Sequence, residues 1–159
     1  MCSSDLVAAA PLDTLPMYLR AGTALPVTEA APHTTSARWA RLSWLIHAGP
    51  DGFVGQLFED AGDGPAGGRA TRLVGERQGA RLTIRRETEG ETGSFEQRET
   101  MHVLGLGHVR AAQGAASFAH EDGVLRLTLP ARWQTVTLEL EPGDDEEPGD
   151  GGTVPVGGA

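Results

Sequence analysis

Two segments near the end of the sequence alternate strictly between apolar and polar residues. The apolar positions are Leu125, Leu127 and Leu129 in the first segment and Val136, Leu138 and Leu140 in the second. Successive side chains of a β-strand point to opposite faces of the sheet, so this spacing places the apolar side chains of a segment on one face. One apolar and one polar face are typical of an antiparallel sheet that covers a core on one side. The alternation therefore predicts an all-β fold.

Shorter stretches of the same kind recur about every ten residues. The sequence contains 22 Gly and 10 Pro, which favour turns over long helices. We expect strands over residues 42–47, 53–58, 82–84 and 101–103, and a further pair of strands over 15–19 and 24–27 around Gly22. No segment is convincingly helical, because Gly114 interrupts the alanine-rich stretch 109–119. Together these signals favour an antiparallel β-sandwich.

Charge is concentrated at the end of the chain. The net charge is −9, from 13 basic and 22 acidic residues, and segment 141–159 holds six of the acids and no basic residue. This segment is rich in Gly and Pro and lacks aromatic residues, so it cannot bury enough apolar surface to offset its chain entropy. We interpret residues 142–159 as a disordered, solubilising acidic tail. The acidic balance argues against nucleic acid and membrane surfaces as partners.

The first residues of the chain are unusual. Back-translation of Met1–Leu6 matches the end of a common sequencing adaptor, so we interpret residues 1–9 as an artefact or leader outside the fold. Cys2 is the only cysteine, and under this interpretation it carries no information about the redox compartment. The sequence therefore leaves the localisation of the protein open.

The sequence offers no catalytic constellation. It has neither a Gly-x-Ser-x-Gly elbow nor a His-Glu-x-x-His zinc motif. The five histidines are scattered, and His102 and His108 are too far apart to form a metal pair on one strand face. We therefore predict no catalytic residue, no metal site and no cofactor.

Tryptophans are the only candidates for ligand binding, because aromatic rings can stack on the apolar faces of sugars. Trp39 and Trp133 lie among polar residues and are the surface candidates for carbohydrate, whereas Trp44 lies in an apolar strand and is expected in the core. An exposed pair of tryptophan rings would favour a carbohydrate-binding module, and buried rings would count against it.

The densest acidic cluster outside the tail follows the expected strand 53–58. It contains Glu59, Asp60 and Asp63. Paired carboxylates could support acid–base chemistry or bind Ca²⁺, but a calcium site needs about six to eight oxygen ligands and this segment lacks a full loop pattern. We interpret the cluster as solvated acids at the end of a strand.

Several short motifs follow one another in a characteristic order. Residues 10–26 read APLDTLPMYLRAGTALP, residues 55–63 read GQLFEDAGD, and strand-like segments follow at 70–74, 80–85 and 123–130. In order and spacing they resemble the region that follows the catalytic barrel in glycoside hydrolase family 31, whose members read approximately A-P-L-D-x-I-P and then L-Y-E-D-D-G. Phe58 occupies the position of the Tyr in the family motif, and Ala61 occupies the position of the second Asp. The Ala61 difference weakens any proposal that this acidic turn has the same role as in the family.

The resemblance implies a parent enzyme of defined chemistry. Family members are retaining α-glycosidases, chiefly α-glucosidases and α-xylosidases, that hydrolyse O-glycosyl bonds with an Asp nucleophile and an Asp acid/base. Both residues lie in an upstream (β/α)₈ barrel, and the nucleophile motif does not occur in this sequence. The fragment alone should therefore be inactive.

The resemblance also implies a division of the chain. Residues 10–50 would be the end of a proximal C-terminal β-domain, and residues 51–141 a distal C-terminal β-sandwich that supports the barrel. Such a fragment should expose apolar surface and self-associate. The alternatives are a stand-alone carbohydrate-binding β-sandwich and a packing module without a ligand.

Overall fold

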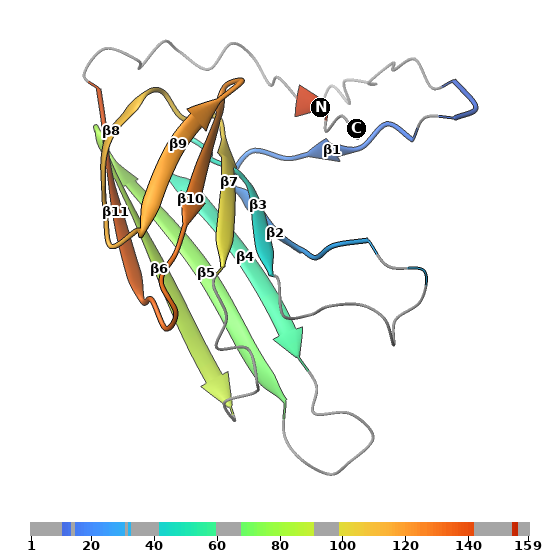
Figure 1. The fold of residues 1–159 in the computed structure, drawn as a ribbon, viewed down its shortest axis with the longest axis horizontal. Helices are drawn as coiled ribbons and strands as arrows, with labels where there is room; N and C mark the ends of the chain where they lie inside the picture. The colour runs from blue at the N-terminus through green and yellow to red at the C-terminus, as the bar shows by residue number, and fades with distance from the viewer. Residues whose placement is uncertain are drawn as a thin grey trace, which may run out of the picture.

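The computed structural model describes residues 11–13, 15–30, 32, 42–59, 68–90, 99–141 and 154–155. Throughout these ranges the regular structure is β, which confirms the predicted fold class (Figure 1). The strands are β1 Tyr18–Leu19, β2 Thr23–Val27, β3 Ser43–His47, β4 Gly52–Glu59, β5 Arg69–Gln78, β6 Arg81–Gly90, β7 Thr100–Leu104, β8 Val109–Gln113, β9 Ser117–Glu121, β10 Val124–Thr128, β11 Thr135–Leu140 and β12 Val154–Pro155. Nowhere in the described ranges is there a helix long and apolar enough to cross a membrane.

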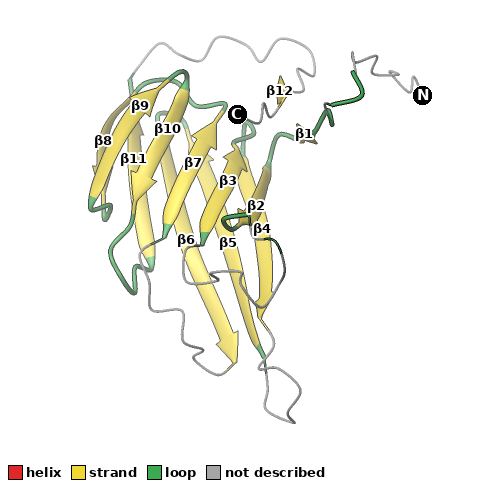
Figure 2. Ribbon diagram, turned by 45° about the vertical axis from the view of Figure 1, so that its right-hand side comes forward, coloured by secondary structure: helices red, strands yellow, loops and turns green. Residues whose placement is uncertain are grey.

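Ten of the strands form one continuous sheet in the order β8-β11-β6-β5-β4-β2-β3-β7-β10-β9. Most neighbours are antiparallel, but β2 runs parallel to β4 and β3 runs parallel to β7. The sheet curves until its two end strands, β8 and β9, lie side by side (Figure 2). A hydrogen bond of 3.0 Å from the Val109 amide to the His120 ring joins them. One sheet therefore supplies both walls around the core.

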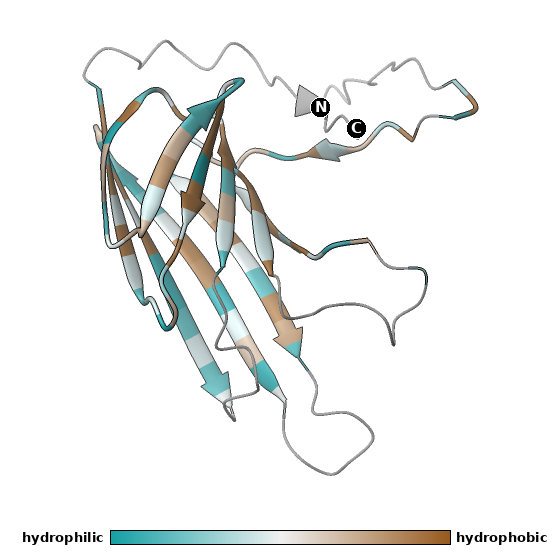
Figure 3. Ribbon diagram, in the orientation of Figure 1, coloured by the Kyte–Doolittle hydropathy of each residue, from teal (hydrophilic) through white to brown (hydrophobic). Residues whose placement is uncertain are grey.

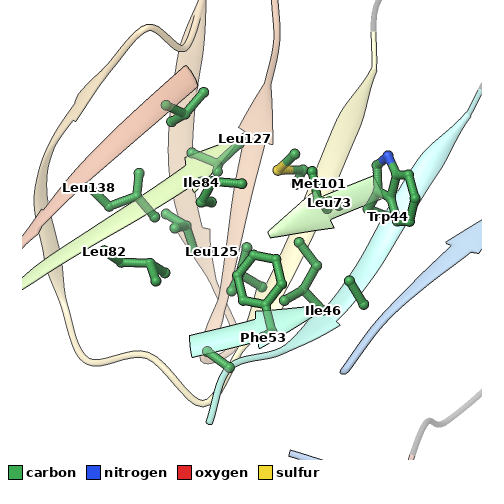
Figure 4. Packing of buried hydrophobic residues seen from close by; sticks show 14 of the residues in the cluster. Trp44, Ile46, Phe53, Leu73, Leu82, Ile84, Met101, Leu125, Leu127 and Leu138 are labelled. Carbon is green, nitrogen blue, oxygen red and sulfur yellow. The ribbon is translucent and has the colours of Figure 1, made fainter. Parts of the chain in front are cut away.

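The inward positions of both walls form a single apolar core (Figure 4). All six apolar residues of the alternating segments are among its buried members, as the sequence predicts. The largest fully buried side chains are Trp44, Ile46, Leu73, Leu82, Ile84, Met101, Leu125, Leu127, Leu129 and Leu138. Burial of each such side chain contributes about 1.5–3 kcal/mol, so this core dominates the stability of the fold.

The expected strand pair over 15–19 and 24–27 does not form, and this prediction is wrong. β1 pairs with β12, whereas β2 pairs with β3 on one side and β4 on the other. Gly22, at φ 82°, turns the chain so that its amide donates to the His47 carbonyl and its carbonyl accepts from the Val54 amide. Two ladder partners satisfy both edges of β2, which a two-stranded hairpin cannot do.

The expected division between residues 50 and 51 falls inside the ten-stranded sheet. β2 and β3 precede this point in the chain, yet they lie between β4 and β7, which follow it. Ala24, Trp44 and Ile46 from the first part share the core with the later strands. Residues 23–27 and 43–47 thus belong to the same structural unit as the later strands.

Two sequence expectations concern the ends of the chain. Residues 1–9 lie outside the described residues. Of the expected acidic tail 142–159, only Val154–Pro155 is described, and there the chain pairs with β1 instead of remaining without structure.

Candidate functional site

Trp133 lies in the interior, so the prediction of an exposed sugar-stacking ring is wrong at this position. The residue is only 4% exposed. Its indole Nε1 donates to Glu99 Oε2 at 3.0 Å, and the Arg86 guanidinium lies over the ring at 5.1 Å from its centroid. Arg86 also donates to Glu99 Oε1 at 2.6 Å. The polar neighbours in sequence reflect this buried network, which leaves no free ring face for a sugar.

The other two tryptophans do not restore a sugar platform. Trp44 is fully buried, as predicted, and lies in the core near Met101 (Figure 4). Trp39 lies outside the described residues. Both tryptophans that the structure describes are therefore buried, which counts against a stacking surface in this part of the chain.

The acidic cluster at the end of β4 is described only at Glu59. Its carboxylate accepts from Arg69 Nε at 2.9 Å across the β4–β5 ladder, and both side chains are mostly buried. Asp60 and Asp63 lie outside the described residues. Glu59 therefore serves as half of a cross-strand ion pair, which accounts for one member of the cluster without a ligand.

Two histidines of the consecutive strands β8 and β9 meet in space. The rings of His108 and His120 are stacked, with centroids 4.6 Å apart and an interplanar angle of 27°. The pair is missed at the level of the sequence because no strands are predicted over residues 109–121, where β8 and β9 follow one another and bring the two rings together. The described ranges contain no group of three or more side chains that could hold a metal ion.

One half of the outer sheet surface, over β5, β6, β11 and β8, is charged. Its outward positions carry cross-strand ion pairs: Arg72–Glu87, Arg85–Glu76, Arg81–Glu139 and Arg110–Glu139. Arg81, Arg110 and Glu139, which form the last two of these ion pairs, line a shallow cavity of about 310 Å³ together with Gln78 and Ala80. Because its charged groups already bind one another, the cavity offers no unsatisfied group that points to a ligand.

The neighbouring half of the outer surface, over β2, β3, β4 and the adjoining part of β5, carries exposed apolar side chains beside the outward polar residues Thr23 and Gln56. Leu25 pairs with Leu45, and Val54 pairs with Val74, on outward positions. Leu25 and Val54 remain 47% and 43% exposed, and the other two are half-buried. We name these four residues the outer apolar patch. In Figure 3 the ribbon is mainly hydrophobic near the arrowhead of β4, whereas the arrowhead of β6 is hydrophilic.

The segment before β2 also exposes apolar side chains. Leu12, Leu15, Met17 and Tyr18 are all exposed. The segment meets the outer face where His47 Nδ1 donates to the Leu19 carbonyl at 3.0 Å. Sequence carried a signal for the patch, because residues 44–46 are apolar without alternation, which is typical of a strand covered on both faces.

No family model matches the chain, and no curated protein matches it. Fold and surface together define the class as an all-β domain with one apolar and one charged outer region.

Proposed function

We propose that the chain is the non-catalytic C-terminal β-domain of a retaining α-glycosidase similar to glycoside hydrolase family 31. Its role is to support an upstream (β/α)₈ barrel that hydrolyses α-linked glucosides or xylosides. The outer apolar patch carries the proposal. Exposure of these apolar side chains to water is unfavourable, so this face of the sheet is expected to pack against another layer.

The position of the patch indicates what covers it. Leu25 lies in β2, and the exposed apolar segment 12–18 leads directly into this strand. A surface continuous with the preceding chain is well placed to pack against an earlier domain of the same polypeptide. Interfaces between domains of one chain are commonly of this mixed apolar and polar kind.

The order of the motifs supports the same proposal. The segments 10–26, 55–63, 70–74 and 80–85 supply β2, β4, β5 and β6, which are consecutive neighbours in the sheet, whereas segment 123–130 supplies β10 near one end of the strand order. Four of the five resembling segments thus build one contiguous region of the fold. The buried Trp44 and Trp133 weigh against the alternative of a stand-alone carbohydrate-binding module.

The test compares two chains from the same genomic locus. The reading frame upstream of these residues should encode a barrel with two catalytic Asp motifs, and the longer chain should hydrolyse an aryl α-glucoside or α-xyloside. The purified 159-residue chain should show no turnover of either substrate. Turnover by the short chain, or a locus without a barrel upstream, would overturn the proposal.

A further inference from the structure

The strands β8 and β9 follow one another in the chain and are connected by residues 114–116, but no backbone ladder joins them. At the end of the pair away from this connection, side chains link the two strands. β8 and β9 are the two ends of the strand order, and they lie side by side in Figure 2. Between them the Val109 amide donates to His120 Nε2 at 3.0 Å, and the ring of His108 stacks on the ring of His120. This junction therefore depends on the state of an imidazole.

The hydrogen bond specifies the protonation state of His120. A nitrogen that accepts an N–H bond cannot carry a proton itself, so the neutral ring must hold its proton on Nδ1. A protonated imidazole carries N–H on both nitrogens and cannot accept from Val109. It would also place a positive charge beside His108. Protonation of His120 thus removes the bond that joins β8 to β9.

We propose that His108 and His120 form a pH-sensitive clasp, which holds the two ends of the sheet together while His120 is neutral and releases them when it is protonated. The residues next to the clasp are part of the core: Val109 and Leu125, which lies opposite His120, are each 1% exposed. Release of the clasp therefore gives solvent access to the core in acid.

The charged side chains on the surrounding strands are engaged with one another. On β9, Glu121 binds Arg126 of β10 at 3.0 Å, and on β8, Arg110 binds Glu139 of β11 at 3.2 Å. The Glu141 amide donates to the His108 carbonyl at 2.9 Å. The remaining titratable side chains on adjoining segments are Asp122, Glu141 and His102.

The electrostatic environment favours neutral His120. Burial lowers the pKa of His120 from its ordinary value of 6.5, and the neighbouring His108 lowers this pKa further. The Val109 backbone raises it by less, so that the net shift of the pKa is downward. The unfolded chain therefore binds a proton at higher pH than the folded chain does. Stability from this group is complete above about pH 6.5 and decreases as the pH falls below that value.

The decisive measurement is the hydrogen-exchange protection factor of the Val109 amide, which corrects for the intrinsic pH dependence of exchange. In the 159-residue chain, protection should fall about three- to tenfold between about pH 7.5 and pH 5, as expected for loss of one hydrogen bond. His120→Gln should abolish this pH dependence, because the amide side chain does not titrate. The matched control His102→Gln should retain it.

A second variant tests the stacked partner without removing the clasp imidazole. His108→Gln should raise the pH at which His120 titrates, measured by NMR of its ring protons, because the like charge is removed. Equal Val109 protection at both pH values in the unmodified chain would overturn the proposal. So would an unchanged pH dependence in His120→Gln or an unchanged His120 titration in His108→Gln.

Discussion

Glu99 shows how a buried charge organises the residues around it. The residue is 5% exposed, and its carboxylate accepts from both Arg86 and Trp133. A buried carboxylate without partners would be strongly unfavourable, so the indole N–H and the guanidinium are required here. Trp133 is buried because its polar atom has a partner that is distant in sequence. The adjacent Arg132 and Gln134 are exposed and conceal this in the sequence.

The two buried tryptophans provide a matched comparison at the residue scale. Trp133→Phe removes a hydrogen bond to a buried carboxylate, whereas Trp44 Nε1 has no hydrogen-bond partner in the described part of the chain. We expect Trp133→Phe to lower the free energy of unfolding by about 1–3 kcal/mol more than Trp44→Phe. Urea unfolding followed by circular dichroism measures both. Equal losses would show that the bond to Glu99 contributes little.

At the scale of the elements, β2 depends on an unusually close approach to β4. Ala24 and Gly55 are opposite each other in the parallel pair, on the inward face. A Cβ added at Gly55 would lie 2.4 Å from the Ala24 carbonyl oxygen and 2.7 Å from the Ala24 Cβ. Glycine at this position is what allows β2 to fit between β3 and β4.

Substitution of this glycine should weaken the centre of the sheet. Gly55→Ala must push β2 and β4 apart, and we expect it to cost about 1–3 kcal/mol of unfolding free energy. Gly79→Asn is the control: φ is +56°, no described atom lies within 4 Å of an added Cβ, and Asn tolerates this conformation. The control should change stability by less than about 0.5 kcal/mol. A neutral Gly55→Ala in urea unfolding would contradict the close packing of β2.

On the scale of the whole molecule, the outer surface of one sheet divides into two regions. Cross-strand ion pairs cover β5, β6, β11 and β8, whereas the outer apolar patch covers β2, β3 and β4. Exposed ion pairs contribute only about 0–1 kcal/mol each to stability, so their main effect is to keep that region soluble. The patch has no such protection and is the region suited to a partner surface.

Polar substitutions in the patch should separate folding from association. Leu25→Thr combined with Val54→Thr places β-branched residues at both strand positions, and it should reduce hydrophobic-dye binding and self-association of the 159-residue chain. Thr83→Ser with Thr137→Ser in the charged region should change neither. In the longer chain, the patch variant should lower stability by about 1–3 kcal/mol, because a buried interface is lost. Unchanged dye binding, measured with sedimentation for association, would argue against an exposed apolar surface.

Most strand positions and the inward residues of the two alternating segments follow from the sequence alone, whereas the strands β8 and β9 and the burial of Trp133 do not. Alternation in β10 and β11 is a local property, since neighbouring side chains on a strand point to opposite faces whatever the strand's partners are. The strands predicted over 42–47 and 53–58 are likewise local signals, and the structure confirms them as β3 and β4.

Strand order was decided only by the tertiary structure. The insertion of β2 between β3 and β4 and the burial of Trp133 on Glu99 both join residues that are far apart in the chain. Alternation says which face of a strand is buried, but not which strand lies beside it. Those pairings depend on how the whole sheet curves around one core.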